Sequence, residues 1–351
     1  MLNLKFFKGK KIFITGHTGF KGSWLSYILY LSGAKLAGYS LKPKNKFDNF
    51  YLLKLDKKII NCYGDVRNKK KLSYEIKKFK PDIIFHLAAQ PLVKESYKNP
   101  IYTFSTNILG TLNILETLRE LKSVKSAVII TSDKCYKNYE KKSGYSEDDE
   151  LGGEDPYSAS KASAENVFFS YYKSFFKNRS KLGLASVRAG NVIGGGDWSQ
   201  DRIIPDLIKS IIVKKKFTIR SPKSTRPWQH IFDLLNGYLI LARKIYKNNK
   251  FNGSWNFGPN KSHVTVIEVI SKLIKILRVN KEVFIKSDKK IKETGLLSLK
   301  TNKSKKNLKW KTKLSLNQSL KIIADWYLCY INDKKSIEKF SKQQIESFFY
   351  D

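Results

Sequence analysis

The chain has 351 residues and an ordinary hydrophobic content of 41%, enough to bury one large domain or two closely joined domains. Its formal net charge is +37, but only nine of its basic residues are arginine, which bidentate phosphate and base contacts favour. We therefore interpret the charge as solvated lysine surfaces and expect no nucleic-acid partner. No run approaches the roughly 20 apolar residues of a membrane span, so we expect no membrane partner either.

Short apolar runs alternate with helical patterns through the first half of the chain. Runs typical of buried strands lie at 11–15, 35–40, 82–89, 126–131 and 182–189. Helical patterns lie at 21–32, 68–79, 100–121 and 156–178. This alternation predicts the α/β class, with a Rossmann-type, doubly wound parallel sheet.

A glycine-rich turn, GHTGFKGSW at 16–24, follows the first predicted strand and opens the first predicted helix. Gly16 permits a tight turn, Gly19 lets the backbone approach a pyrophosphate, and Gly22 lets the helix pack on the strand. The start of the helix then offers free N–H groups to phosphates. In this strand–helix context, the turn predicts a dinucleotide site rather than an ordinary loop.

The segment TSDKCY at 131–136 follows a predicted strand, at the sheet edge where ligands bind in such folds. A dehydrogenase or an epimerase needs one hydroxyl donor at this place, and Ser132 supplies one. Asp133 and Lys134 add an acid and an amine, which indicates a second proton transfer such as the elimination of water. An exposed Asp–Lys pair is the alternative interpretation.

The segment DPYSASK at 155–161 predicts the start of a helix, with Asp155 as its N-cap and Pro156 as its first residue. Tyr157 and Lys161 are then one helical turn apart on the same face. A lysine ammonium beside a phenol lowers the phenol's pKa, so Tyr157 becomes a candidate base for a substrate hydroxyl.

Regular alternation ends near residue 190. The sequence predicts a glycine-rich loop, a helix over 201–213 interrupted early by Pro205, a helix over 231–246, a strand within 253–259 and a helical, lysine-rich final third. We expect two interleaved domains. One comprises 1–190 with parts of 226–260, and a smaller, mostly helical one comprises 191–225 and 260–351.

The GxxGxxG spacing resembles that of the extended short-chain dehydrogenases/reductases, and GDVRN, HLAAQ and STNILGTLNILE resemble further motifs of that family. The resemblance implies that the dinucleotide contacts Gly16, Thr18, Gly19, Phe20, Gly22, Asp65, Val66, Leu87, Ala88, Ala89, Gln90, Asn107, Tyr157 and Lys161. Asp65 corresponds to the residue that meets the adenine. An acidic residue usually ends the second strand in NAD-dependent members. Tyr39 and Ser40 stand there, followed by Lys42 and Lys44. Taken alone, these residues favour NADP, so the choice between NAD and NADP stays open.

Within that family the chain resembles the nucleotide-sugar 4,6-dehydratases, and among them the CDP-glucose 4,6-dehydratases, which carry Asp-Lys after the hydroxyl residue. GHTGFKGSWL, TSDKCY, DPYSASK, SVRAGNVIGGGDWSQDRIIPD, RPWQHI and WNFGP share this likeness over about residues 8–330. The segment KNYEKKSGYS at 137–146 departs from it, because the family usually has a tryptophan-containing loop there.

The resemblance implies a hydro-lyase that converts CDP-glucose into CDP-4-keto-6-deoxyglucose with a tightly held, internally recycled NAD. Tyr157 would deprotonate the 4-hydroxyl, Ser132 would hold the 4-oxygen, Lys134 would take the C5 proton, and Asp133 would protonate the departing 6-hydroxyl. Asn191, Arg202 and Arg226 would contact the substrate, where an arginine can bind a diphosphate through two hydrogen bonds. The pathway it implies is deoxysugar biosynthesis, as for a lipopolysaccharide O-antigen.

Several expectations concern location, assembly and competing functions. Cys62, Cys135 and Cys329 form no paired framework, and the N-terminal residues lack a signal-peptide pattern, so we expect a cytoplasmic protein. No cluster has metal-ligand spacing, so we expect no metal. The resemblance implies a homodimer or homotetramer. An epimerase or dehydratase of another nucleotide sugar, and a non-catalytic dinucleotide-binding regulator, are the alternative functions.

Overall fold

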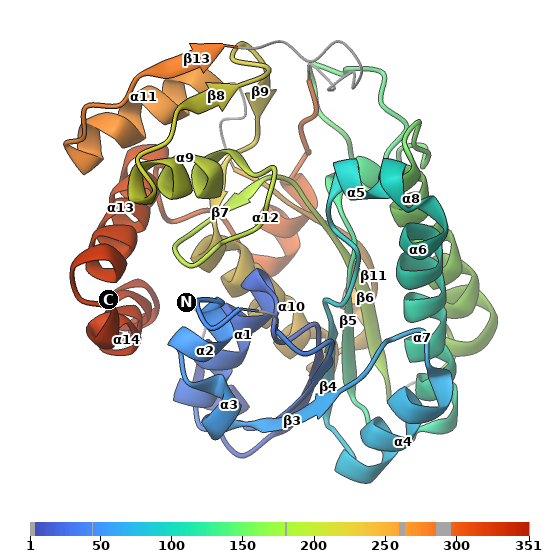
Figure 1. Ribbon diagram of the computed structural model, residues 1–351. Helices are drawn as coiled ribbons and strands as arrows, with labels where there is room; N and C mark the ends of the chain where they lie inside the picture. The colour runs from blue at the N-terminus through green and yellow to red at the C-terminus, as the bar shows by residue number, and fades with distance from the viewer. Residues whose placement is uncertain (1–3, 44, 180, 260–263, 286–295, 351) are drawn as a thin grey trace.

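A computed structural model describes residues 4–43, 45–179, 181–259, 264–285 and 296–350. At its centre lies a seven-stranded sheet in which all neighbouring strands are parallel. In order across the sheet, the strands are β11 (Gly253–Phe257), β6 (Gly183–Ala189), β5 (Ser126–Ile130), β4 (Ile83–His86), β1 (Lys11–Thr15), β2 (Lys35–Ser40) and β3 (Ile60–Tyr63). This order confirms the expected α/β class and the Rossmann-type sheet (Figure 1).

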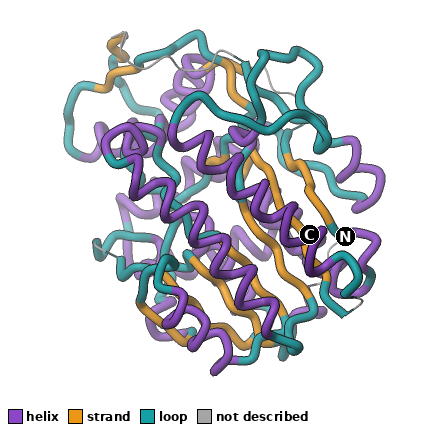
Figure 2. The backbone as a smooth tube through the Cα atoms, turned by 90° about the vertical axis from the view of Figure 1, so that its right-hand side faces the viewer, coloured by secondary structure: helices purple, strands orange, loops and turns teal. Residues whose placement is uncertain are grey.

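Helices cover both faces of the sheet, which explains why β4, β5 and β6 are buried at every residue. On one face lie α4 (Lys69–Phe79), α7 (Gly110–Glu120) and α8 (Pro156–Tyr171), whose apolar residues share one core cluster. On the other face lie α1 (Phe20–Leu31) and α10 (Ile231–Lys247), which share a second cluster. Figure 2 shows long helices crossing in front of the strands.

The structure extends and corrects the predicted elements. The sequence analysis missed β3 and three short helices, α2 (Asn49–Leu52), α3 (Leu55–Lys58) and α5 (Val93–Lys98). The helix expected over 100–121 is a continuous run of α6 (Pro100–Phe104), a π-helical turn (Ser105–Leu109) and α7. Pro205 does not interrupt its helix. It lies in the first turn of α9 (Ile203–Ile212), where the missing N–H has no intrahelical partner to lose.

The second half of the chain packs over the carboxyl ends of the strands (Figure 1). It contains three small two-stranded sheets, which pair β7 (Val192–Ile193) with β10 (Gln229–His230), β8 (Phe217–Ile219) with β13 (Val283–Ile285), and β9 (Thr225–Arg226) with β12 (Val264–Thr265). Its other helices are α11 (Val266–Leu277), α12 (Asn302–Leu308), α13 (Leu316–Asn332) and α14 (Ile337–Tyr350). Within the described ranges, no helix has the length and apolarity needed to cross a bilayer.

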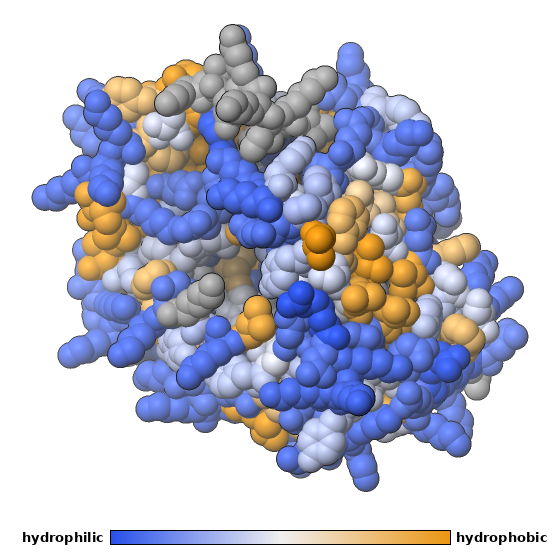
Figure 3. All heavy atoms as spheres, turned by 45° about the vertical axis from the view of Figure 1, so that its right-hand side comes forward, coloured by the Kyte–Doolittle hydropathy of each residue, from blue (hydrophilic) through white to orange (hydrophobic). Residues whose placement is uncertain are grey.

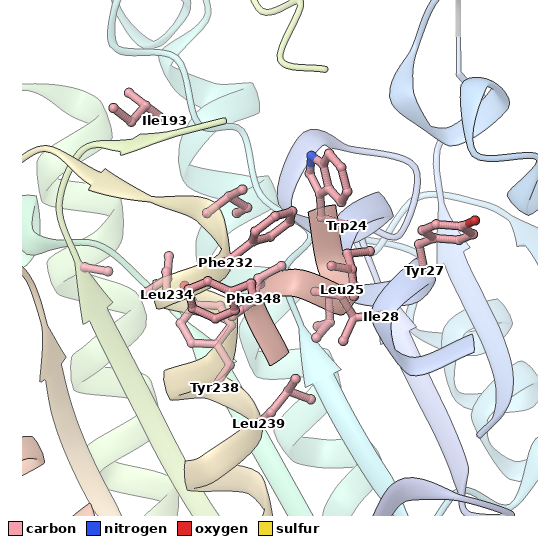
Figure 4. Packing of buried hydrophobic residues seen from close by; sticks show 14 of the residues in the cluster. Trp24, Leu25, Tyr27, Ile28, Ile193, Phe232, Leu234, Tyr238, Leu239 and Phe348 are labelled. Carbon is pink, nitrogen blue, oxygen red and sulfur yellow. The ribbon is translucent and has the colours of Figure 1, made fainter. Parts of the chain in front are cut away.

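Aromatic side chains join the two halves in one core (Figure 4). Trp24 of α1 packs edge-to-face on Phe232 of α10, with 5.1 Å between the ring centroids. Phe348 of α14 lies 5.6 Å from the same Phe232 ring. The C-terminal helix is therefore anchored directly to the helices that cover the sheet.

The order of the strands places a crevice at one edge of the sheet. The chain adds β2 and β3 on one side of β1 and then crosses to β4 on the other side. Loops that leave β1 and β4 consequently diverge at their carboxyl ends, and ligands of such folds bind at this switch point.

Candidate active site

A cavity of about 1270 Å³ lies at the carboxyl ends of the strands. It is lined by the glycine turn, the segment that follows β5, the first turn of α8 and residues of the second half of the chain. The predicted site residues that line it are Gly16, Thr18, Gly19, Phe20, Gly22, Asp65, Val66, Leu87, Ala88, Ala89, Ser132, Asp133, Lys134, Tyr157, Lys161, Asn191, Arg202 and Arg226. One space thus brings together residues that lie up to 210 positions apart, from Gly16 to Arg226.

Two predicted cofactor residues, Gln90 and Asn107, do not line the cavity and are buried behind the residues that do. The Asn107 side-chain oxygen accepts a hydrogen bond from the Gln90 N–H at 2.8 Å, and its amide donates to the Gln90 carbonyl and to Ser160 Oγ. Asn107 therefore holds the backbone that follows Leu87–Ala89 in place. None of residues 137–146, where the sequence departs from the family pattern, lines the cavity.

The three glycines of the turn have different structural roles. Gly16 has φ +74°, and a Cβ there would lie 2.7 Å from the Ala88 nitrogen. A Cβ on Gly22 would lie 2.0 Å from the Gly16 carbonyl oxygen, so only glycine lets α1 approach the turn. Gly19 is different, because it has an ordinary φ of −75° and its Cβ would meet only the Gly16 oxygen, at 3.4 Å, among the described residues.

Gly19 also caps α1 without a side-chain hydrogen bond, and it lines the cavity. Folding alone does not require glycine at this position. The space beside it and the N–H groups of the first helical turn fit the pyrophosphate of a dinucleotide. This geometry supports the site predicted from the sequence.

The end of β2 bears hydroxyl groups rather than charges. Ser40 lines the cavity, and its Oγ lies 2.7 Å from Thr18 Oγ1. Lys42, which left NADP open, is exposed and does not line the cavity, and Lys44 lies outside the described residues. Beyond β3, hydrogen bonds from Arg67 lower the pKa of Asp65, so this carboxylate is a ready acceptor for an amino group.

Helix α8 places Tyr157 and Lys161 in the cavity. Asp155 caps it as predicted, accepting a hydrogen bond from the Ser158 N–H at 3.0 Å. Burial lowers the pKa of Lys161 to about 8. The expected lowering of the Tyr157 pKa is wrong, because burial of the phenol raises this pKa by more than the hydrogen bond with the Ser132 hydroxyl lowers it.

Directly after β5 and Thr131, Asp133–Cys135 form a short 3-10 turn that Ser132 caps. Ser132 Oγ donates to the Asp133 carboxylate at 3.1 Å and accepts from the Lys134 N–H at 3.2 Å. Burial raises the pKa of Asp133, although the Lys134 charge opposes the shift. Burial thus moves the carboxyl group towards the protonated form that a general acid needs.

The sequence analysis missed several residues of the site. Gly190 makes room for the acid, since a Cβ there would lie 2.7 Å from Asp133 Oδ2. Asp201 forms ion pairs across the cavity, 2.7 Å from Lys94 and 3.3 Å from Arg220. Lys21 lies inside the glycine motif itself and lines the cavity, so its place in the motif could have identified it.

The sheet order, the glycine turn and the serine, tyrosine and lysine around one cavity define a dinucleotide-binding enzyme of the extended short-chain dehydrogenase/reductase class. A family model described as GDP-mannose 4,6 dehydratase matches residues 13–323. The chain belongs to this family of nucleotide-sugar enzymes.

Curated relatives and solved structures agree with this membership. The chain is 40% identical to the CDP-glucose 4,6-dehydratase of Salmonella typhimurium, over 99% of this chain and 98% of that protein. It is 30% identical to the CDP-paratose 2-epimerase of Salmonella typhi, over 69% of this chain and 78% of that protein. The dTDP-glucose 4,6-dehydratase of Bacillus anthracis, solved in complex with NAD, shares the fold with a TM-score of 0.78, at 23% identity over 93% of this chain and 98% of that one.

Proposed function

We propose that this protein is a CDP-glucose 4,6-dehydratase, which converts CDP-glucose into CDP-4-keto-6-deoxyglucose and water. The observation that carries the proposal is the turn Ser132–Asp133–Lys134, which lines one cavity with Tyr157 and Lys161. An epimerase needs the hydroxyl, the phenol and the amine of α8, but it does not need an added acid and amine. Near full-length identity of 40% to a curated CDP-glucose 4,6-dehydratase supports this substrate over other nucleotide sugars.

NAD is the cofactor that the cavity fits. Gly16, Gly19 and the first turn of α1 would hold its pyrophosphate, and Asp65 would hold its adenine. When bound, the nicotinamide supplies the hydride acceptor for C4 and the hydride donor for C6. Ser40 rather than Lys42 lines the cavity at the end of β2, and this supports NAD over NADP.

Oxidation at C4 assigns roles to three residues. Tyr157 takes the proton of the sugar 4-hydroxyl, and Ser132 donates a hydrogen bond to the same oxygen. Burial raises the pKa of Tyr157, so the phenolate needs a nearby cation. Lys161, one helical turn further along α8, provides that charge.

Elimination of water uses the other two residues. The 4-ketone acidifies the C5 proton, which Lys134 removes as the C5–C6 double bond forms. The C6–O6 bond breaks while Asp133 gives its proton to O6, and water leaves. Lys134 returns a proton to C5 when C6 is reduced. Over the whole reaction Tyr157 gains one proton from the 4-hydroxyl and Asp133 loses one proton to the departing water. The number of protons on the enzyme is therefore unchanged.

The nucleotide would lie at the end of the cavity that the second half of the chain lines. There Asn191, Arg202 and Arg226 would contact the sugar-nucleotide diphosphate. The proposed division of the chain follows from these roles. Residues 1–190 with parts of 226–260 bind NAD, and β11 belongs to this part because it pairs with β6. Residues 191–225 and 260–351 form the substrate domain, of which 260–263 and 286–295 lie outside the described residues.

A second copy of the chain is the proposed oligomeric partner, in a dimer or tetramer. Ile101 on α6 and Phe169 on α8 are 84% and 59% exposed, and these helices contact each other. Figure 3 shows an apolar area on this side of the molecule. Ile101→Glu should shift sedimentation towards the monomer if the helices form the interface, and unchanged sedimentation would exclude it.

Three unpaired cysteines support a cytoplasmic location.

Incubation with CDP-glucose in deuterated water, without added reductant, tests the function. Dehydration predicts a 4-keto-6-deoxy sugar with deuterium at C5 and no net formation of NADH. Epimerisation would leave C5 unlabelled and the 6-hydroxyl in place, and a regulator would leave the sugar unchanged. Parallel incubations with dTDP-, GDP- and UDP-sugars test the nucleotide.

Lys134→Met tests the assignment of the base. The variant should still reduce the bound cofactor when substrate is added but should stall before water is lost, with a decrease of at least about 100-fold in dehydration. Lys137→Met is the matched control, because this neighbouring lysine is exposed and does not line the cavity. Full turnover of the Lys134 variant would remove Lys134 from the mechanism.

A further inference from the structure

Lys21 is a lysine of the cavity to which the proposed mechanism gives no role. It belongs to the first turn of α1, between Gly19 and Gly22, and it lines the cavity together with Asp133 and Lys161. Strand β4 alone separates β1, which precedes the glycine turn, from β5, which precedes Asp133. Lys21 and the catalytic turn therefore lie at the same edge of the sheet and line the same cavity, with the carboxyl end of one strand between them.

The charges that act on Lys21 belong to the catalytic turn and to the second half of the chain. Burial lowers the pKa of Lys21 to about 8, and the charges that act on it are those of Arg202, Asp133 and Asp197. Lys21 in turn is the charge that most strongly lowers the pKa of Lys161. Among the described residues, no hydrogen bond or ion pair occupies the Lys21 ammonium, so it is available to the reaction.

Loss of the Asp133 proton leaves a buried negative charge that the Lys21 ammonium can compensate. When Asp133 protonates O6, a buried carboxylate remains, and such a charge is costly unless a cation compensates it. Lys134 gains its positive charge only as it takes up the C5 proton, so a cation that is present before the step begins would stabilise the carboxylate from the start. Lys21 is the other lysine that acts on the Asp133 carboxyl group.

We infer that Lys21 is a positioning residue for the general acid, whose ammonium stabilises the Asp133 carboxylate during the elimination of water. This inference rests on the proposed dehydratase function. It implies that the glycine turn serves the chemistry of the sugar as well as the binding of the dinucleotide. No new bond is formed by Lys21, and it keeps its proton throughout the step.

Substitution of Lys21 should separate the two halves of the reaction. In Lys21→Met and Lys21→Gln, loaded with NAD and mixed with CDP-glucose, we expect cofactor reduction within about threefold of the wild-type rate. Rapid-quench mass spectrometry should show the 4-keto-glucose accumulating. Without the Lys21 cation the pKa of Asp133 should rise by about one unit, and this weaker acid slows water loss by about tenfold. Lys21→Arg keeps the charge and should restore most of the rate.

The pH profile of water loss gives a readout that a structural role would not move. Asp133 must be protonated, so water loss falls as the pH rises through its pKa. Removal of a cation raises that pKa, and the alkaline limb should move to higher pH by about one unit in Lys21→Met but not in Lys21→Arg. The groups that also face Asp133 or Lys21 are Lys134, Cys135, Tyr157, Lys161, Asp197 and Arg202.

Three outcomes would overturn the inference. Equal losses in cofactor reduction and water loss would indicate a general structural role. A CDP dissociation constant raised about tenfold with normal water loss, measured by calorimetry, would make Lys21 a phosphate ligand. Wild-type rates in both neutral variants would exclude any role. Lys35→Met, an exposed lysine at the opposite end of β2, controls for lost charge. If the wild-type protein forms no dehydrated sugar, the proposed function fails first, and the inference fails with it.

Discussion

Removal of the Glu165 carboxylate tests how the protein holds its catalytic turn in place. Glu165 lies one turn beyond Lys161 on α8, and its Oε2 is 2.7 Å from Arg188 Nη2 of β6. The two side chains are only 1% and 5% exposed. Thr131, directly before Ser132, donates a hydrogen bond to Glu165 Oε1 at 2.5 Å. The ion pair thus supports the catalytic turn from behind.

The expected cost of Glu165→Ala follows from this burial. Removal of one partner leaves the Arg188 guanidinium buried without a countercharge, which destabilises proteins by about 3–5 kcal/mol. For a chain of 351 residues, the corresponding fall in Tm is about 4–7 °C. The turnover rate should fall as well, because Thr131 loses its acceptor and the Ser132–Asp133 turn is held less firmly.

Urea titration followed by circular dichroism measures this loss, with Asp325→Ala as the control. Asp325 pairs with Lys321 on the surface of α13, so its removal should cost less than about 1 kcal/mol. Burial alone would raise the pKa of Glu165, but Arg188 and hydroxyl donors outweigh burial and the pKa is lowered. The pair therefore stabilises the fold above pH 4.5, and the difference from wild type should shrink as the pH falls below that value. Equal losses in the two variants would refute the reasoning.

Two further predictions concern the glycine turn and the histidines. Gly22→Ala should lower Tm sharply because its Cβ would lie 2.0 Å from a backbone oxygen, whereas Gly19→Ala should keep the Tm of the ligand-free protein and weaken NAD binding by at least about tenfold. Calorimetry of both variants checks this contrast, and similar Tm losses would contradict it. Burial lowers the pKa of His17 to about 4 and those of His86 and His230 to about 3, so the unfolded chain binds protons that the folded chain does not. Their stabilising contribution is complete above pH 6.5 and is lost as the pH falls, so urea titrations at about pH 7 and about pH 5 should show a lower free energy of unfolding at pH 5.

Elements with strong local signals were predictable from the sequence. The strands β1 and β2 have the predicted bounds, because each is a largely apolar run that comes shortly after a turn. Strand β3 was missed since it is an edge strand whose first residue, Ile60, is 58% exposed, and it lacks a long apolar run. Short helices such as α5 carry too few residues for a helical period to be visible.

The site shows the same division between local and long-range causes. Glycine spacing, the Asp155 cap and the one-turn separation of Tyr157 and Lys161 are local, and the structure has them as predicted. The direction of the Tyr157 pKa shift was wrong, because burial of the phenol raises the pKa by more than the Ser132 hydrogen bond and the Arg202 charge lower it. The contact of Gly190 with Asp133 was also missed, since it joins loops that are 57 residues apart.

The sequence by itself determined which residue types follow each strand and what chemistry they can perform, because such patterns depend on near neighbours along the chain. Only the tertiary structure decided which of those residues share one cavity and which charges act on one another. The physical reason is that parallel strands bring their carboxyl ends to one edge, where burial and Coulomb forces depend on distances in space rather than along the chain.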